Sequence, residues 1–154
     1  MTIGKSYFLT YLLECLKHVD EGGFITVIDP KMDEPSRWAK ANGVRVIYPA
    51  TDRSKSDFVA QINDSLSECL KLIHKRQQAL FNNPNTTFKH VTVVIDEVLA
   101  LSEGVNKNIK DTFFALLSQI ALLGRATHVH LVLVSQRFDH TSVPTSVREQ
   151  MNVL

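Results

Sequence analysis

The sequence predicts an α/β fold in which a mainly parallel sheet lies between two layers of helices. Its expected strands are apolar throughout, as in Phe24–Ile28, instead of alternating between apolar and polar residues. Uninterrupted runs of this kind are typical of parallel strands that are buried on both faces. Amphipathic helical segments alternate with these strands along the chain, which favours a sheet covered by helices on both sides.

The order of the elements follows from apolar periodicity and from the turn residues between them. Gly22-Gly23 ends the first helical pattern, and Asp29-Pro30 stops the first strand. The expected segments are a helix over Tyr7–Val19, a strand over Phe24–Ile28, a short helix over Glu34–Asn42, a strand over Val44–Tyr48, a helix over Lys55–Phe81, a strand over Val91–Ile95, a helix over Lys107–Leu123, a strand over His130–Val134, and a polar tail over Phe138–Leu154 with a short helix from Val143.

Length and composition fit one ordinary globular domain. A chain of 154 residues can bury a sizeable core, and its 44% apolar and 21% charged content are average values. The net charge of +1 gives no argument from bulk charge for a nucleic-acid partner. Cys15 and Cys69 lack a CxxC companion and are expected to be reduced thiols of a cytoplasmic protein. We expect neither a membrane span nor a leader sequence.

Gly4-Lys5-Ser6, at the start of the first helix, matches the second half of the pattern G-x-x-x-x-G-K-[ST]. The first N–H groups of a helix point at a bound anion. In this pattern the lysine reaches the β- and γ-phosphates, and the hydroxyl holds Mg²⁺. Gly4, Lys5 and Ser6 are therefore predicted to bind ATP, with Ser6 also a ligand of Mg²⁺. A capped helix start is the alternative interpretation of the same tripeptide.

Two adjacent carboxylates follow the apolar strand Val91–Ile95. Asp96 is predicted to bind the nucleotide's Mg²⁺, directly or through water, and Glu97 to orient and deprotonate an attacking water. Residues that cap the next helix are the alternative. Gln136 follows the strand His130–Val134, where its amide could contact a γ-phosphate, although many strands end in Gln.

Four motifs stand in order along the chain: Asp29-Pro30-Lys31, Val94-Ile95-Asp96-Glu97, Leu123-Gly124-Arg125-Ala126 and His130-Leu131-Val132-Leu133-Val134-Ser135-Gln136-Arg137. Asp29 and Lys31 of the first motif also fit ordinary turn residues. Together the four motifs resemble the FtsK/SpoIIIE DNA translocases, which belong to a larger group with HerA and the conjugative coupling proteins. The resemblance extends over nearly the whole chain.

The resemblance implies a three-layer RecA-like P-loop NTPase fold that binds ATP and Mg²⁺. It implies self-association into a ring, usually a hexamer, that moves double-stranded DNA in chromosome segregation or conjugation. Arg125 matches the arginine finger that reaches the neighbouring subunit's ATP, and Gln136 matches the γ-phosphate sensor. The implied location is cytoplasmic, and any anchor to the inner face of a bacterial membrane would lie in segments outside this sequence.

The sequence departs from the family at its beginning. The family has small residues before its GKS, whereas Met1, Thr2 and Ile3 stand here, and the first glycine of the pattern would precede Met1. We therefore expect residues 1–154 to be a single partial RecA-like motor domain that lacks the Walker A strand and the last core strand. The strand His130–Ser135 would then have an open edge, covered by the tail or by another chain.

Two consequences are expected from these departures. This chain alone should bind ATP weakly or not at all, because a β-branched Ile3 impedes close approach of the backbone to phosphate. The sequence also leaves two other functions open. One is a different RecA-like motor, such as a helicase or packaging ATPase, and the other is a degenerate P-loop domain that acts as an interaction module.

Overall fold

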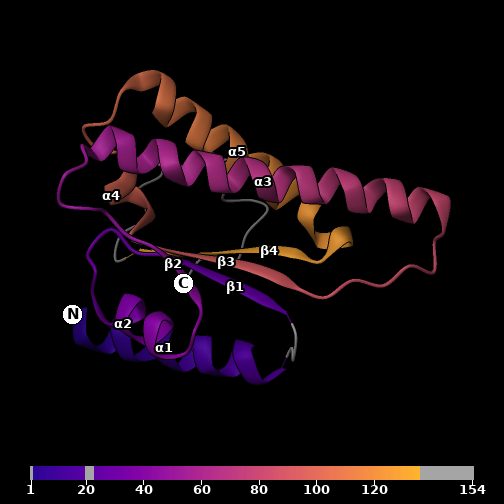
Figure 1. Ribbon diagram of the computed structural model, residues 1–154, viewed down its shortest axis with the longest axis horizontal. Coiled ribbons are helices and arrows are strands. Elements are labelled where there is room, and N and C mark those ends of the chain that lie inside the picture. Colours follow the sequence, from indigo (N-terminus) through magenta and orange to yellow (C-terminus); the bar gives the residue numbers. More distant parts are fainter. Residues whose placement is uncertain (1, 20–22, 136–154) are drawn as a thin grey trace.

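The computed structural model describes the backbone of residues 2–19 and 23–135, with the side chains of residues 9–17 and 23–135 (Figure 1). Its elements are α1 (Thr2–Val19), β1 (Phe24–Ile28), α2 (Glu34–Ala41), β2 (Arg45–Ile47), α3 (Lys55–Asn82), β3 (Val91–Asp96), α4 (Val98–Ser102), α5 (Lys107–Thr127) and β4 (Val129–Val134).

The four strands form one parallel sheet in the order β2-β1-β3-β4. Ile28 of β1 lies opposite Ile95 of β3, and Asp96 lies opposite Val134 of β4. Each strand is joined to the next by a crossover that contains a helix, which parallel pairing requires. The predicted α/β class with a parallel sheet is confirmed.

The molecule has three layers (Figure 1). Helices α1 and α2 cover one face of the sheet, and the long helices α3 and α5 cover the other. On the first face a smaller apolar cluster joins α1, α2 and the sheet, and its buried members are Leu9, Leu13, Val27, Trp38, Ala39, Val94 and Val134.

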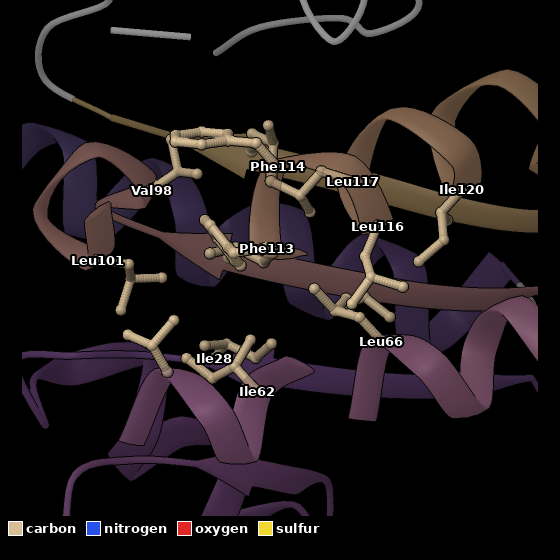
Figure 2. Close-up of a cluster of buried hydrophobic side chains, with 14 of the residues drawn as sticks. Ile28, Ile62, Leu66, Val98, Leu101, Phe113, Phe114, Leu116, Leu117 and Ile120 are labelled. Atoms are coloured by element: carbon tan, nitrogen blue, oxygen red, sulfur yellow. The ribbon is translucent and has the colours of Figure 1, made fainter. Parts of the chain in front are cut away.

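A larger apolar cluster lies between the sheet and helices α3, α4 and α5 (Figure 2). Phe113 is fully buried in it, and its ring centroid lies 5.4 Å from that of Phe114. Burying a Phe side chain contributes about 2–3 kcal/mol. Val98 and Leu101 bring the short helix α4 into the same cluster, so the turn that precedes α4 is held by packing.

Two helix boundaries differ from the expected ones by four residues or more. Helix α1 begins at Thr2 instead of Tyr7, which places Gly4-Lys5-Ser6 inside the helix. Helix α5 continues past the expected end at Leu123 to Thr127, and the left-handed His128, with φ 58°, ends it.

The end at Leu123 was wrong because Gly124 serves packing instead of stopping the helix. A Cβ atom on Gly124 would lie 2.1 Å from the carbonyl oxygen of Val129. The missing side chain therefore lets the last turn of α5 lie against the start of β4.

β4 is the last strand in the described sheet, as expected. The prediction that the tail covers its outer edge, and the expected helix from Val143, concern residues 136–154, which lie outside the described residues. Among the helices that the structure describes, none is long and apolar enough to cross a membrane.

Candidate functional site

The carboxyl ends of the parallel strands meet at one edge of the sheet, here called the carboxyl edge. Asp29 follows β1, Asp96 ends β3 and Ser135 follows β4. Helix α1 ends beside the start of β1 and runs antiparallel to it, so α1 also begins at the carboxyl edge (Figure 1). In open α/β sheets, ligands bind at this edge and anions bind where a helix starts.

Asp96 and Glu97 form a buried carboxylate pair at this edge, with 6% and 9% of their surfaces exposed. Glu97 has left-handed backbone geometry, with φ 54°, which costs a residue with a side chain about 1–2 kcal/mol. The buried side chains of Val98 and Leu101 hold α4 in place and so maintain this turn. Glu97 occupies the N-cap position of α4, but its side chain makes no capping hydrogen bond. Helix capping therefore does not explain why a residue with a carboxylate occupies this position.

Asp29 organises the turn that follows β1. Its side chain is fully buried. Its Oδ1 accepts a hydrogen bond from the Lys31 N–H at 3.0 Å, and its Oδ2 accepts from the Asp33 N–H at 2.8 Å and the Ser36 hydroxyl at 2.7 Å. A carboxylate with three donors fixes the backbone of residues 29–33. Asp29 therefore has the role of a turn residue, which was one of the interpretations of its sequence position.

The turn after β1 brings Lys31 to the carboxylate pair. Lys31 Nζ lies 3.8 Å from Glu97 Oε1, and their side chains are 47% and 11% exposed. The residues belong to turns after two neighbouring strands, β1 and β3. The sequence placed both residues at strand ends but did not predict their contact.

The remaining predicted nucleotide residues are only partly covered by the structure. Gly4, Lys5 and Ser6 lie in the first turns of α1 at the carboxyl edge, and their side chains are outside the described residues. Gln136 directly follows the last described residue, Ser135. The roles assigned to these four residues therefore stay predictions.

Arg125 lies at the opposite, amino edge of the sheet. It is an exposed residue in the last turn of α5, just before β4 begins at Val129. Asp96 pairs with Val134 at the other end of β4. Five steps along a strand cover about 16 Å, so Arg125 is far from the carboxylates of its own chain.

A stack of three histidines at the amino edge was not predicted from the sequence. The ring centroid of His90 lies 4.5 Å from that of His128 and 5.0 Å from that of His130. His90 Nδ1 lies 2.7 Å from His130 Nε2. In the described part of the chain, no group of three or more His, Cys, Asp or Glu side chains could hold a metal ion. Mg²⁺ with a nucleotide needs fewer protein ligands, because phosphate oxygens and water complete its shell.

Arg76 of α3 binds the end of α5. Its guanidinium donates a hydrogen bond to the Thr127 carbonyl at 2.8 Å and lies 4.8 Å from the centroid of the Phe88 ring. Partial burial lowers the pKa of Arg76, although an arginine stays charged at any physiological pH. This contact positions the helix end that carries Arg125.

A groove of about 740 Å³ opens beside the amino ends of β1 and β3. Ile25, Val44 and Leu72 contribute apolar surface to it, and Phe24 at its rim is 64% exposed. Cys69 also lines the groove. Burial raises the pKa of the Cys69 thiol, the charge of Arg45 opposes this effect, and Glu68 adds to it.

No protein-family model and no curated protein sequence matches the chain. Solved structures that are similar to it include the following three. The pCW3 conjugation coupling protein TcpA, in a monomer form with ATPγS, has 20% identity and a TM-score of 0.54 over 84% of this chain. EssC (ATPases 2 and 3) from Geobacillus thermodenitrificans has 12% identity and a TM-score of 0.58 over 82%. Thermomonospora curvata EccC (ATPases 2 and 3), in complex with a signal sequence peptide, has 17% identity and a TM-score of 0.50 over 83%.

The similarity covers only part of those proteins. This chain spans 39% of the TcpA chain and 24% of each of the other two. At this level of identity the likeness concerns the fold. The predicted fold class, an α/β domain with a parallel sheet between helices, is therefore confirmed, and the described sheet has four strands.

Proposed function

We propose that the chain is the motor part of an ATPase of the FtsK/SpoIIIE type, which uses ATP hydrolysis to move double-stranded DNA. One observation carries the proposal: the carboxylate pair Asp96–Glu97 is buried at the same edge where helix α1, with its Gly4-Lys5-Ser6 sequence, begins. A buried pair of carboxylates is costly unless cations or donors compensate it. The Mg²⁺ ion of a magnesium–nucleotide complex would supply positive charge at such a site.

Each residue of the carboxyl edge has a distinct task in this proposal. Asp96 would hold Mg²⁺ together with Ser6, and Lys5 and the helix start would hold the phosphates. Bound Mg²⁺ would neutralise charge on the phosphates. Glu97 would accept the proton of the attacking water, and Gln136 would contact the γ-phosphate.

Arg125 would act on the nucleotide of a neighbouring subunit. The length of β4, about 16 Å, separates it from the carboxylates of its own chain, and it is exposed at the amino edge. In a ring, the amino edge of one subunit would meet the carboxyl edge of the next, and a guanidinium there stabilises charge that builds up on phosphate. The exposure of Arg125 supports this role.

A polypeptide is the second candidate substrate. The EccC structure contains a signal sequence peptide, and this chain has an apolar groove beside Phe24 and Ile25. DNA remains the first candidate because the sequence motifs, from Asp29-Pro30-Lys31 onward, resemble DNA translocases. If a polypeptide is the substrate, an apolar peptide should stimulate ATP hydrolysis and DNA should not.

The experiment measures ATP hydrolysis with and without double-stranded DNA. It compares the 154-residue chain with the same chain preceded by a complete phosphate loop. We expect activity in the second form, stimulated by DNA and reduced at least 100-fold by Lys5→Ala or Glu97→Gln. Glu103→Gln, an exposed carboxylate in the nearby loop after α4, is the matched control and should hydrolyse normally. An inactive protein that binds a partner would favour the interaction module, and activity that survives Glu97→Gln would refute the assigned site.

A further inference from the structure

We propose that Lys31 is a positioning residue for Glu97, holding its carboxylate in the orientation needed to take a proton from water. This inference rests on the proposed function, because it assigns a partner to the proposed general base. It starts from the ion pair between Lys31 Nζ and Glu97 Oε1, which are 3.8 Å apart. Neither residue type at a strand end indicates such a contact by itself.

The backbone on both sides of the ion pair is fixed. On the Lys31 side, Asp29 accepts hydrogen bonds from the Lys31 and Asp33 N–H groups and is itself fully buried. On the Glu97 side, the left-handed turn is held by α4, whose Val98 and Leu101 are fully buried. The two turns therefore present lysine and glutamate to each other from rigid positions, which a functional site requires.

The ion pair is a poor source of stability. Lys31 is 47% exposed, and half-exposed pairs of this kind contribute about 0–1 kcal/mol to folding. The left-handed backbone of Glu97 costs about 1–2 kcal/mol, which such an ion pair does not offset. The arrangement is therefore better explained by the orientation of the carboxylate than by stabilisation of the fold.

Orientation of a general base affects turnover more than substrate binding. A misplacement of about 1 Å in a catalytic group can cost roughly 100-fold in rate. If Lys31 only orients Glu97, its loss lowers kcat and leaves the KM for ATP nearly unchanged, because no ground-state contact to ATP is lost. If Lys31 instead bound phosphate directly, its loss would raise KM.

The test uses the ATP-hydrolysing form of the protein described above. We expect Lys31→Met to lower kcat about 10- to 100-fold with KM for ATP within about twofold of wild type. Lys31→Arg should recover much of the loss, because it keeps a positive charge at that place. Lys40→Met is the control, since it removes another exposed lysine that contacts Tyr48 at 3.3 Å. It should leave hydrolysis unchanged.

A double variant separates an effect through Glu97 from an independent one. In the Glu97→Gln background, Lys31→Met should cause no further loss of kcat, because effects that act through one group are not additive. Full additivity, a raised KM, an unchanged kcat or a large fall in the unfolding midpoint of Lys31→Met would each overturn the inference. If Glu97→Gln abolishes hydrolysis and Lys31→Met does not change it, this inference alone fails. If the protein hydrolyses no ATP, it fails together with the proposed function.

Discussion

Asp96 and Arg125 lie at opposite ends of the β3–β4 pair. Asp96 is paired with Val134, the last residue of β4, whereas Arg125 precedes Val129, the first residue of that strand. The two groups that the motor proposal assigns to one reaction are thus far apart within one subunit. Both groups could act on the same nucleotide if the site is shared between two neighbouring subunits, one contributing Asp96 and the other Arg125.

Mixing two inactive variants tests this arrangement. Arg125→Ala and Glu97→Gln should each reduce hydrolysis strongly, about 100-fold or more. In the proposed ring, such a mixture would contain some interfaces with an intact Glu97 from one subunit and an intact Arg125 from the other. We therefore expect the mixture to hydrolyse ATP well above the mean of its two components, measured as turnover per subunit.

The control for Arg125 is Arg53→Ala. Arg53 is also exposed, and it contacts Gln61 at 2.7 Å within its own subunit. This variant should hydrolyse ATP normally. A mixture that never exceeds the mean of its components would place Arg125 outside a shared site.

Substitution of Gly124 should destabilise the fold. Alanine favours a helix over glycine by about 1 kcal/mol, but its Cβ would lie 2.1 Å from the Val129 carbonyl oxygen. The backbone must then shift, and overpacking of this kind costs about 1–3 kcal/mol or more. We expect Gly124→Ala to lower the urea midpoint of unfolding, with the clash outweighing the gain in helix propensity.

The matched control is Ala126→Ser, an exposed position in the same turn of α5. It should change the free energy of unfolding by no more than about 0.5 kcal/mol. If Gly124→Ala proved more stable than wild type, the close packing between α5 and β4 would be refuted.

Loss of Arg76 should loosen the end of α5. Its hydrogen bond to the Thr127 carbonyl and its contact with Phe88 are both lost in Arg76→Met. A hydrogen bond from a charged group contributes about 1.5–3 kcal/mol. We expect a drop in unfolding free energy of about that size, measured by urea denaturation. Its neighbour Lys75 is exposed, so Lys75→Met is the control. An equal loss of stability in Lys75→Met would show that the contacts of Arg76 with Thr127 and Phe88 have no special role.

Cys69 should resist alkylation in the folded protein. Burial, the largest effect, raises the pKa of its thiol, and only the thiolate is nucleophilic. In a Cys15→Ala background at pH 8, iodoacetamide should therefore react more slowly with the folded chain than with the urea-unfolded chain. An equal rate in both states would contradict the partly buried position of Cys69.

The same thiol makes stability depend on pH. Because its pKa is raised in the folded state, the unfolded chain loses its proton first. The stabilising contribution is fully present below the ordinary thiol pKa of about 8.5 and is lost as the pH rises through the folded value. Cys69→Ser should reduce this alkaline loss of stability in urea titrations.

Local patterns in the sequence were sufficient for most elements. The β-branched run Phe24–Ile28 ends at Asp29-Pro30, and the strand has the expected bounds. The helix end predicted at Leu123 was wrong because a glycine near a helix end can allow close packing as well as end the helix. Only the position of Val129 decides between the two roles of Gly124. The short helix α4 was not expected, since Val98 and Leu101 become a buried face only when α5 packs over them.

The candidate site was predictable at the level of strand ends. The apolar strand before Asp96 and Glu97 was enough to place both carboxylates at the carboxyl edge. Contacts between residues distant in sequence were not predictable. The ion pair of Lys31 with Glu97 and the stacking of His90 on His128 depend on strand order and register, which single-sequence patterns leave open.

Equilibrium binding of a fluorescent ATP analogue tests the central claim most directly. In the chain preceded by a complete phosphate loop, we predict Mg²⁺-dependent binding that Asp96→Asn weakens at least 10-fold, because it removes a carboxylate ligand of the metal. Asp111→Asn, an exposed carboxylate on α5, should bind as wild type does. Binding that is independent of Mg²⁺, or equally tight in Asp96→Asn, would contradict a nucleotide site at the carboxyl edge.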